Sequence, residues 1–383
     1  MSSFLKNRRG IALLLTLTIT TVLIAATLEL NRQVRTTVIA TATTRDRLLL
    51  SHIASSGIHL GMAMLIKDRY GSNADSVQED WADPEKISEL LQEFPFEEGS
   101  VTFKISDELG KIQVNALIKK FPGHRLNDLQ YNMWDNLLRP IVSKDEDADI
   151  NATSSIIGSL KDWLDSKDDD ATEFSGAETA YYETLDPPYE CRNGPIPHVD
   201  ELLMVKGMTP EILYGTGEAP DEITGSKEML GTEEAPSGIT SYLTVYGMKK
   251  TRPRRKNRKN KTFQYEGKIN INTADLPVLK VLTGPDHEEC AQAMYDYREE
   301  QEEGADTKTY VNALSGTGWY RNISGCGDVK INSKLLTNTS DTFRIESAAT
   351  LHDAKMTITT VVQRERDKKT RKWKCRVLNW QEE

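Results

Sequence analysis

The sequence predicts an α+β protein in which a long N-terminal helix leads into a soluble region of strands and helices. Three observations support this class. An uncharged apolar stretch near the N-terminus continues into further helical periodicity. Alternating strand patterns lie at both ends of the soluble region, and helical patterns fill its middle. The simplest arrangement is an α-rich domain inserted into an α+β domain whose sheet joins segments far apart in sequence.

The apolar stretch covers residues 11–28 and follows the basic segment KNRRG. A helix of this length spans roughly 27 Å, close to the hydrocarbon thickness of a bilayer. The preceding lysine and arginines favour a cytoplasmic N-terminus. Ala25 and Ala26 offer a weak cleavage site for an ordinary signal peptide.

The helical pattern continues well beyond this stretch. Apolar and small residues recur at helical spacing as far as Met64, and no proline falls between Ile11 and Arg69. A continuous helix over 11–69 would be roughly 90 Å long. We therefore expect a membrane span that runs on into the soluble region, not a leader that is discarded.

Strand patterns follow the helix and return near the C-terminus. Val101, Phe103 and Ile105 alternate with polar residues, which predicts a half-buried strand, a turn at 108–110 and then a second strand. The segments DTFRIESAATLHDAKMTITTVVQRE and KWKCRVLNW also read as strands. Before the first strand, SVQEDWADPEKISELLQEF is a helical stretch interrupted by Pro84.

Helical patterns occupy the middle of the chain. They occur in LNDLQYNMWDNLLRPIV, SSIIGSLKDWLDS, HVDELLMVKGMTPEILYG and LPVLKVLTGPDHEECAQAMYDYREE.

Composition argues against two broad functional classes. The net charge is -10 and the pI about 5.3, which disfavours a general nucleic-acid binder. The six histidines are scattered, and neither H-E-x-x-H, G-x-S-x-G nor a phosphate-binding loop occurs. We therefore expect a non-enzymatic protein.

The start of the chain resembles a prepilin leader. In that family a short basic segment and a glycine precede the apolar helix, and a membrane-embedded prepilin peptidase cuts after the glycine. The resemblance implies cleavage between Gly10 and Ile11, with the helix kept on the mature protein and its new N-terminus open to methylation. Glycine fits a bond that must be extended for cleavage, because it is a poor helix former.

Further segments resemble the minor pseudopilin K family of bacterial type II secretion systems. They are SDELGKIQVNAL, LKDWLDSKDDD, GAETAYYETLDPPYECRNGPIPHVDELLMVKGM, and SYLTVYG followed by GKININTADLPVLKVL. Leu15 agrees with this member, which lacks the glutamate that most pilins carry at the fifth mature position. Ile11 departs from the phenylalanine that pilins usually have first.

The resemblance implies a pilin-like α+β domain with a large inserted α-helical domain that contains helix-hairpin-helix-like elements. The expected divisions are a leader at 1–10, the transmembrane and spine helix at 11–69, the first part of the pilin-like domain at 70–120, the inserted domain at 121–325, and C-terminal strands of the pilin-like domain at 326–383.

The family's role implies a tip subunit of the secretion pseudopilus. It would initiate or cap pseudopilus assembly for export of folded proteins from the periplasm across the outer membrane. Its expected partners are the minor pseudopilins of the I and J types, the pseudopilus shaft and the prepilin peptidase. It would be a single-pass protein of the inner membrane with its bulk in the periplasm.

The acidic segment after Trp163 suggests a cation site. Asp165, Asp168, Asp169 and Asp170 crowd one turn, and clustered carboxylates on a fixed loop are costly unless a cation neutralises them. Hard oxygen ligands suit Ca²⁺, although no EF-hand pattern occurs. A solvated acidic loop is the alternative. The resemblance favours calcium, and Glu178 is a candidate ligand from the next segment.

The four cysteines allow three complete pairings. The periplasm permits disulfides. Cys290 and Cys326 flank one segment and can pair, while Cys191 and Cys375 can pair or stay free.

Two helical hairpins leave a rival function open. VDELLMVKGMTPEIL and ADLPVLKVLTGPDHEECAQAM resemble helix-hairpin-helix elements, which often bind DNA phosphates, and 251–261 is a basic run. A membrane-anchored DNA-binding or DNA-uptake protein, or a minor pilin of a type IV pilus, is therefore the alternative. Each hairpin lacks the second glycine of a phosphate-binding turn, and Pro285 removes an N–H group, so we expect hairpins used for packing.

Overall fold

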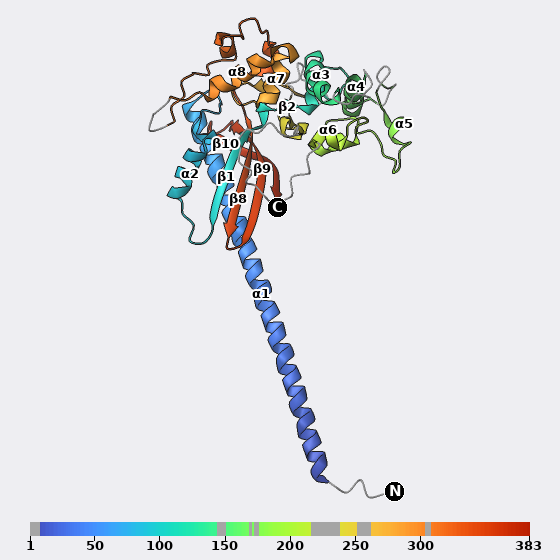
Figure 1. The fold of residues 1–383 in the computed structure, drawn as a ribbon, viewed down its shortest axis with the longest axis vertical. Helices are drawn as coiled ribbons and strands as arrows, with labels where there is room; N and C mark the ends of the chain where they lie inside the picture. The colour runs from blue at the N-terminus through green and yellow to red at the C-terminus, as the bar shows by residue number, and fades with distance from the viewer. Residues whose placement is uncertain are drawn as a thin grey trace.

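The computed structural model describes residues 8–143, 151–167, 171, 176–215, 238–250, 262–302 and 308–383, and the structural statements below concern these residues. The protein has the predicted α+β fold, with a head carried at one end of a very long helix (Figure 1).

Helix α1, Arg8–Gly71, forms the stalk and enters the head. Its 64 residues correspond to roughly 96 Å. Threonine hydroxyls within the apolar part bond back to the helix backbone; Thr16 Oγ1, for example, lies 2.9 Å from the carbonyl oxygen of Leu13. Within the described chain, α1 alone is long and apolar enough to cross a membrane, with a mean hydropathy of 2.4 and no burial over its most apolar window.

The head contains a four-stranded antiparallel sheet in the order β1-β8-β9-β10. Its strands are β1 (Ser100–Asp107), β8 (Thr342–Leu351), β9 (Ala354–Arg366) and β10 (Trp373–Glu382). Strand β1 pairs with β8 across the whole insertion, with Ser100 opposite Thr350. The sheet therefore joins the two ends of the soluble region, as the sequence predicts.

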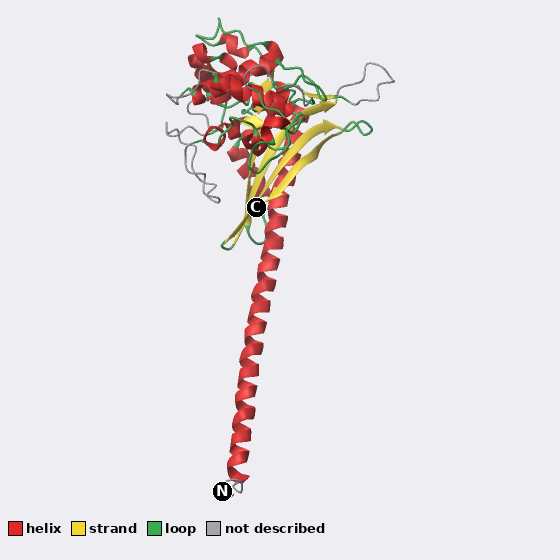
Figure 2. Ribbon diagram, turned by 90° about the vertical axis from the view of Figure 1, so that its right-hand side faces the viewer, coloured by secondary structure: helices red, strands yellow, loops and turns green. Residues whose placement is uncertain are grey.

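The upper part of α1 lies against one face of this sheet (Figure 2). Leu50, Ile53 and Ile58 of α1 are buried there with Phe103 and Ile345 of the strands. This face of α1 excludes water from the sheet and forms the smaller of two apolar cores.

A glycine in α1 allows this close approach. A Cβ atom at Gly57 would lie 2.3 Å from Ser347 Oγ on β8 and 2.9 Å from Val101 Cγ2 on β1, so a side chain there would require these neighbours or the helix to move. Helix α2, Pro84–Glu93, covers the sheet edge beside β1, and Asp83 caps it by accepting from the N–H of Glu85. The predicted helical stretch thus begins at Pro84, which is favourable at the first helical position.

The inserted domain is mostly helical. Its α-helices are α3 (Asp128–Val142), α4 (Ala152–Leu164), α5 (Thr179–Tyr182), α6 (Pro210–Tyr214), α7 (Leu276–Thr283) and α8 (Glu288–Glu299). Short strands form three two-stranded pairs: β2 (Ile112–Gln113) with β3 (Leu243–Thr244), β4 (Met248–Lys250) with β5 (Phe263–Tyr265), and β6 (Ile269–Asn270) with β7 (Leu336–Thr337). Eight 3-10 turns lie at Asp80–Ala82, Glu108–Gly110, Val114–Leu117, Val199–Met204, Ile239–Tyr242, Pro285–His287, Trp319–Asn322 and Ser333–Leu335.

The inserted domain is wider than the predicted range 121–325. Its core already includes Ile112 and Leu117, and it still includes Leu335 and Leu336. The predicted second strand after the turn at 108–110 is present as β2, but it has two residues and pairs with β3 inside the insertion. Pairings this short leave no periodic pattern in the sequence.

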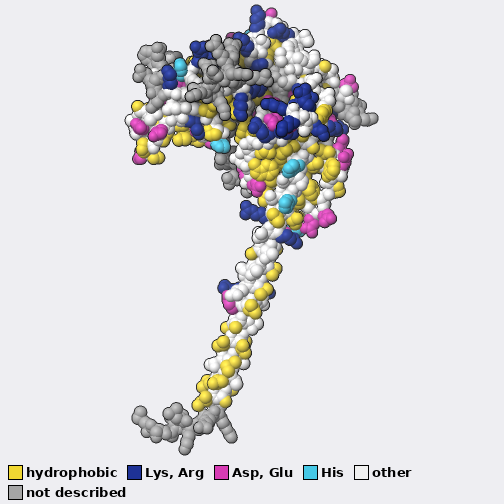
Figure 3. Space-filling model, turned by 180° about the vertical axis from the view of Figure 1, so that it is seen from behind, with side chains coloured by type: hydrophobic (Ala, Val, Ile, Leu, Met, Phe, Trp, Pro, Cys, Tyr) yellow, Lys and Arg dark blue, Asp and Glu magenta, His cyan; other side chains and the backbone are white. Residues whose placement is uncertain are grey.

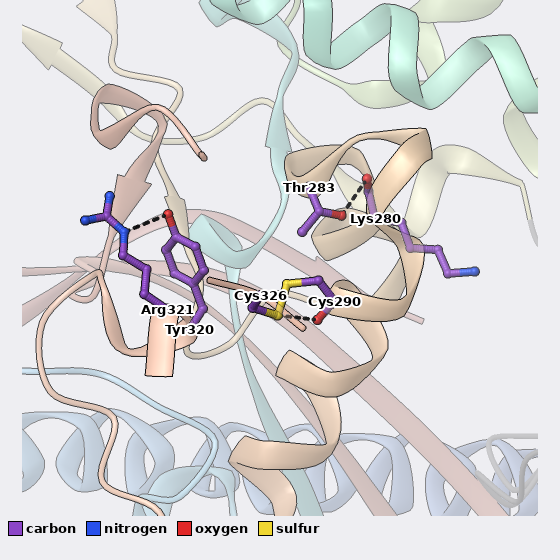
Figure 4. Close-up of a disulfide and its surroundings, with 6 residues drawn as sticks. All are labelled: Lys280, Thr283, Cys290, Tyr320, Arg321 and Cys326. Carbon is purple, nitrogen blue, oxygen red and sulfur yellow. Dashed lines mark hydrogen bonds between the residues drawn. A yellow bond between two sulfur atoms is a disulfide. The ribbon is translucent and has the colours of Figure 1, made fainter. Parts of the chain in front are cut away.

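A disulfide joins the start of α8 to a loop that follows the 3-10 turn at Trp319–Asn322 (Figure 4). Cys290 and Cys326 have Cα atoms 5.2 Å apart, and Cys326 is fully buried. Among the pairings left open by the sequence, the structure therefore contains this one, with Cys191 and Cys375 as free thiols. Burial raises the pKa of the Cys191 thiol to about 12, which keeps it protonated.

Candidate functional site

Three buried carboxylates converge where α4 ends. Asp162 lies in the last turn of α4, Asp165 follows its end, and Glu178 precedes α5. One oxygen atom from each carboxylate lies within 4.8 Å of the others. Their exposed fractions are 0%, 0% and 5%, which is unusual for carboxylates.

Local interactions fix this geometry. Asp165 Oδ1 accepts a hydrogen bond of 2.9 Å from the N–H of Lys167, which turns the chain out of the helix. The buried indole of Trp163 packs edge-on against Tyr182, with ring centroids 4.9 Å apart, and its Nε1 donates to Glu201 at 3.0 Å. The end of α4 is therefore held against α5, which brings Glu178 beside the two aspartates.

A lysine lies beside two of these carboxylates. Lys161 Nζ lies 3.0 Å from Asp162 Oδ1 and 3.1 Å from Asp165 Oδ2. Burial disfavours the ammonium, but these two contacts raise the pKa of Lys161 above its ordinary value. Lys161 thus contacts two of the three carboxylates, and the converging carboxylate oxygens are of the kind that hard cations prefer.

The structure brings together two of the five predicted ligands. Asp165 and Glu178 meet, whereas Asp168, Asp169 and Asp170 lie outside the described residues. Sequence reasoning missed Asp162. The sequence does contain a signal for Asp162: it lies three residues before Asp165, and this spacing places both side chains on the same side of the helix end.

A second acidic group, Asp68, Asp75 and Glu79, has a different character. The buried guanidinium of Arg364 sits among these residues, bonding Asp68 at 3.0 Å and also Asp75. Burial and the neighbouring Glu79 and Asp75 raise the pKa of Asp68 to about 7. Arg364 already supplies a positive charge here, so this group is a structural ion-pair network.

Buried polar contacts attach the inserted domain to the sheet. Asp107, at the end of β1, accepts hydrogen bonds from Asn270 at 2.9 Å, Thr273 at 2.7 Å, Ser340, and the N–H of Leu109 at 2.8 Å. The sequence signatures SDELGKI and NINT thus meet at one junction.

Glu108, the next residue, bonds to Arg344 of β8 at 2.7 Å and to Thr244 of the insertion. Burial works to raise the pKa of Glu108, but Lys111 and Arg344 lower it, so it remains ionised. The junction therefore fixes how the insertion sits on the sheet.

The predicted processing residues lie at the far end of α1. Ile11 and Leu15 are exposed by 57% and 56%, as suits side chains that face lipid or neighbouring helices. Gly10 lies within α1, because the helix begins at Arg8. The Gly10–Ile11 bond is therefore helical in this structure, and the expected extended conformation would require the first turn to unwind.

The two hairpins do not form favourable phosphate sites. In the first, a 3-10 turn at Val199–Met204 precedes the five-residue helix α6. In the second, Glu288 and Glu289 occupy the first turn of α8, and Glu288 pairs with Lys280 at 2.8 Å. Acidic side chains at a helix N-terminus repel phosphate, so these hairpins serve packing. The basic run 251–261 lies outside the described residues.

Comparisons with known proteins agree with the motifs. A family model described as type II secretion system protein K matches residues 110–214. The type II secretion system protein K of Aeromonas hydrophila is 25% identical over 203 residues, covering 51% of this chain and 59% of that protein. The corresponding protein of Klebsiella pneumoniae is 25% identical over 212 residues, covering 53% and 59%. The chain thus aligns with less than two thirds of these relatives' own length.

The fold has a solved counterpart. A chain in the crystal structure of the GspK–GspI–GspJ complex from the enterotoxigenic Escherichia coli type 2 secretion system matches with a TM-score of 0.60 and 15% identity. The match covers 90% of this chain and 99% of that chain. The comparisons confirm the family resemblance that the sequence predicts.

Proposed function

We propose that this chain, a relative of protein K of the type II secretion system, is a minor pseudopilin that forms the tip of the pseudopilus. The observation that carries the proposal is the combination of one apolar stalk helix with a head whose fold matches a chain of the GspK–GspI–GspJ complex. Its role is structural: it initiates or caps the filament used to export folded proteins, and it performs no catalysis.

The membrane arrangement follows from α1. Its apolar N-terminal part would span the inner membrane, and the head would lie in the periplasm at the far end of the stalk. After removal of the leader, α1 would pack beside the helices of the minor pseudopilins of the I and J types and the shaft.

The shape of the head supports a position at the tip. The head overhangs the stalk on more than one side (Figures 1 and 2). A filament built from parallel stalks has least room for such a head along its shaft and most at its end. Leu15 fits the same position, because a terminal subunit has no earlier neighbour whose amino group would need a glutamate.

Immunogold labelling of pseudopili tests the tip position. We expect label at one end of each filament, and shorter filaments when the protein is overproduced. Leu15→Glu should reduce secretion or allow the subunit to enter the shaft, whereas Leu14→Ile, on the same exposed surface, should leave secretion unchanged. Regular label along the whole filament would contradict the tip assignment.

We further propose that the carboxylates of Asp162, Asp165 and Glu178 bind Ca²⁺. The support is their burial and the convergence of one oxygen atom from each carboxylate. The ion would supply positive charge that holds the end of α4 against α5. Asp168, Asp169 and Asp170 remain predicted ligands from the adjoining segment.

A further inference from the structure

A basic surface lies on one face of the head, although the chain as a whole is acidic. The residues 365–376 hold seven lysines and arginines against two acidic residues, in a chain with a net charge of -10. They form the end of β9, the following turn and the start of β10. Figure 3 shows lysine and arginine side chains gathered on this face of the head, above the stalk.

The turn between β9 and β10 is built to present its lysines outward. Asp367 Oδ1 accepts hydrogen bonds of 2.9 Å from the N–H groups of Lys369 and Thr370, which lower the pKa of Asp367 to about 2. Arg366 donates to the carbonyl of Arg371 at 2.7 Å. The acid in the turn is therefore used to shape the backbone.

Several cations of this turn are available to a partner. The side chains of Lys368, Lys369 and Lys372 are exposed and have no side-chain acceptor within the described part of the chain. Lys374 is different, since Glu365 at 3.3 Å and Asp367 at 3.5 Å surround it.

Beside the turn, a cavity of about 250 Å³ lies between the sheet and the inserted domain. Arg69, Lys111, Lys249 and Lys268 contribute to its wall, together with Trp373 from β10. Arg69 stacks over the Trp373 ring at 5.4 Å, and Lys249 pairs with Glu266 at 3.0 Å. Lys111 pairs with Glu108 at 3.4 Å, and Asp341 also lines the cavity, so within the described residues Arg69 and Lys268 are the wall cations without an acidic partner. These two cations extend the basic surface from the turn into a polar recess that can hold a carboxylate-bearing side chain.

Strand β10 offers a second kind of contact at the same place. Among the described strands it pairs with β9 alone, so its other edge has no strand partner there, although the N–H of Trp373 donates to the hydroxyl of Tyr70 at 3.4 Å. Val377 and Leu378 on this strand are exposed by 44% and 37%. An open edge next to exposed apolar side chains and cations suits an extended peptide, because backbone hydrogen bonds and side-chain contacts can form together.

We propose that the β9–β10 turn, the adjacent recess and the open edge of β10 bind an extended, acidic polypeptide segment of a partner protein. The cations attract its carboxylates, and β10 adds its backbone as a strand. Charge alone would also attract nucleic acid, but a polynucleotide cannot form a strand ladder. The proposal does not depend on the tip assignment, and the site excludes residues 251–261.

The test uses the full-length protein in nanodiscs of neutral phosphatidylcholine and measures fluorescence anisotropy of labelled decapeptides. The probe alternates glutamate and valine, and matched peptides replace glutamate with glutamine or lysine. We expect the glutamate peptide to bind at least tenfold more tightly than the glutamine peptide at low salt, with the difference shrinking as salt rises. Equal binding of these two peptides would overturn the proposal.

Variants locate the site. Lys368→Glu with Lys369→Glu should weaken binding of the glutamate peptide at least tenfold. The matched control, Lys330→Glu with Lys334→Glu, reverses two exposed charges elsewhere on the head and should change binding less than twofold. If both variants lose affinity for the glutamate peptide equally, the effect of charge is nonspecific and the proposed location of the site is wrong.

A peptide methylated on every backbone nitrogen separates strand addition from charge attraction. It keeps every carboxylate but donates no backbone hydrogen bond from either edge, so we expect at least tenfold weaker binding. Unchanged binding would overturn strand addition. Tighter binding of single-stranded DNA than of the glutamate peptide would overturn the polypeptide partner in favour of a nucleic acid.

Discussion

At the scale of residues, burial gives the carboxylates of this protein three different roles. Glu108 is stabilised as an ion by Arg344 and Lys111, and it ties β8 to the insertion. Asp107 depends on hydrogen-bond donors without a direct ion pair. Asp162 and Asp165 share Lys161, and together with Glu178 they are the candidate cation ligands.

Removal of calcium should lower the melting temperature of the full-length protein. An ion that binds only the folded state adds about 2.7 kcal/mol at one hundred times its Kd, which corresponds to a shift of several degrees. Calorimetry with chelator and with added Ca²⁺ measures this difference. Asp165→Asn should abolish most of the calcium response.

A matched variant guards against a general loss of stability. Asp75→Asn also changes a buried carboxylate, but one that Arg364 already neutralises. This variant should melt earlier and still respond to calcium. If chelation leaves the melting temperature of metal-free wild type unchanged, the cluster binds no calcium.

Asp107 should make stability depend on pH. Burial raises the pKa of Asp107 to about 6, against the lowering effect of its hydrogen bonds. A carboxyl group whose pKa is higher in the folded state favours folding below the unfolded pKa, near 4, and this contribution is lost as pH rises through 6. Between pH 4 and pH 7, the free energy of unfolding of the wild type should therefore fall on the order of 2–3 kcal/mol more than that of Asp107→Asn.

Urea denaturation at several pH values measures this effect. The relevant quantity is the pH slope of the unfolding free energy, since Asp107→Asn also loses hydrogen bonds and will be less stable overall. Asp286→Asn, an exposed change, should retain the wild-type slope. Parallel slopes for the wild type and Asp107→Asn would contradict the prediction.

At the scale of elements, long periodic segments were predictable and short ones were not. The helix over 11–69 appears as α1, and the strands around Val101, Phe343 and Val362 form the sheet, because burial of one face imposes a repeat on the sequence. The predicted helix around Val199 became a 3-10 turn followed by the short helix α6.

Processing should remove the leader before α1. Mass spectrometry of the mature protein should find Ile11 as its first residue, because the basic leader places the Gly10–Ile11 bond at the cytoplasmic face. Gly10→Val should retain the leader, since the bond must leave its helical conformation to be cut and valine hinders access. Ala25→Val, at the competing site, should have no effect. A mature N-terminus after Ala26 would contradict this processing.

The disulfide should stabilise the inserted domain. Its cysteines are 36 residues apart, for which loop-closure entropy gives about 3–4 kcal/mol. Cys290→Ser with Cys326→Ser should lower the melting temperature by several degrees. Reducing agent should lower the melting temperature of the wild type to that of the double variant, and it should not change the melting temperature of the variant. If reducing agent also lowers the melting temperature of the variant, the loss of stability does not come from this disulfide.

At the scale of the whole molecule, the sequence predicted the insertion but not its edges. Strand patterns at both ends and helices between them implied a sheet closed across an insertion, and β1 pairs with β8 accordingly. The edges were missed because Ile112 and Leu336 lie in two-residue strands whose partners are distant. In the acidic cluster, crowding of carboxylates in the sequence marks Asp165, whereas the approach of Glu178 to it depends on the fold.

The pairing of β1 with β8 also sets an order of events during biosynthesis. Ser100 and Thr350, which contact each other at 2.7 Å, are 250 residues apart. At roughly 5–20 residues per second, β8 is synthesised on the order of ten or more seconds after β1. Throughout that interval Ile53 and Ile58 of α1 lack the strands that later cover them. The sheet can therefore close only after the insertion and the C-terminal strands have been synthesised. A chain that stops within the insertion keeps an exposed apolar helix face, which chaperones and proteases can recognise.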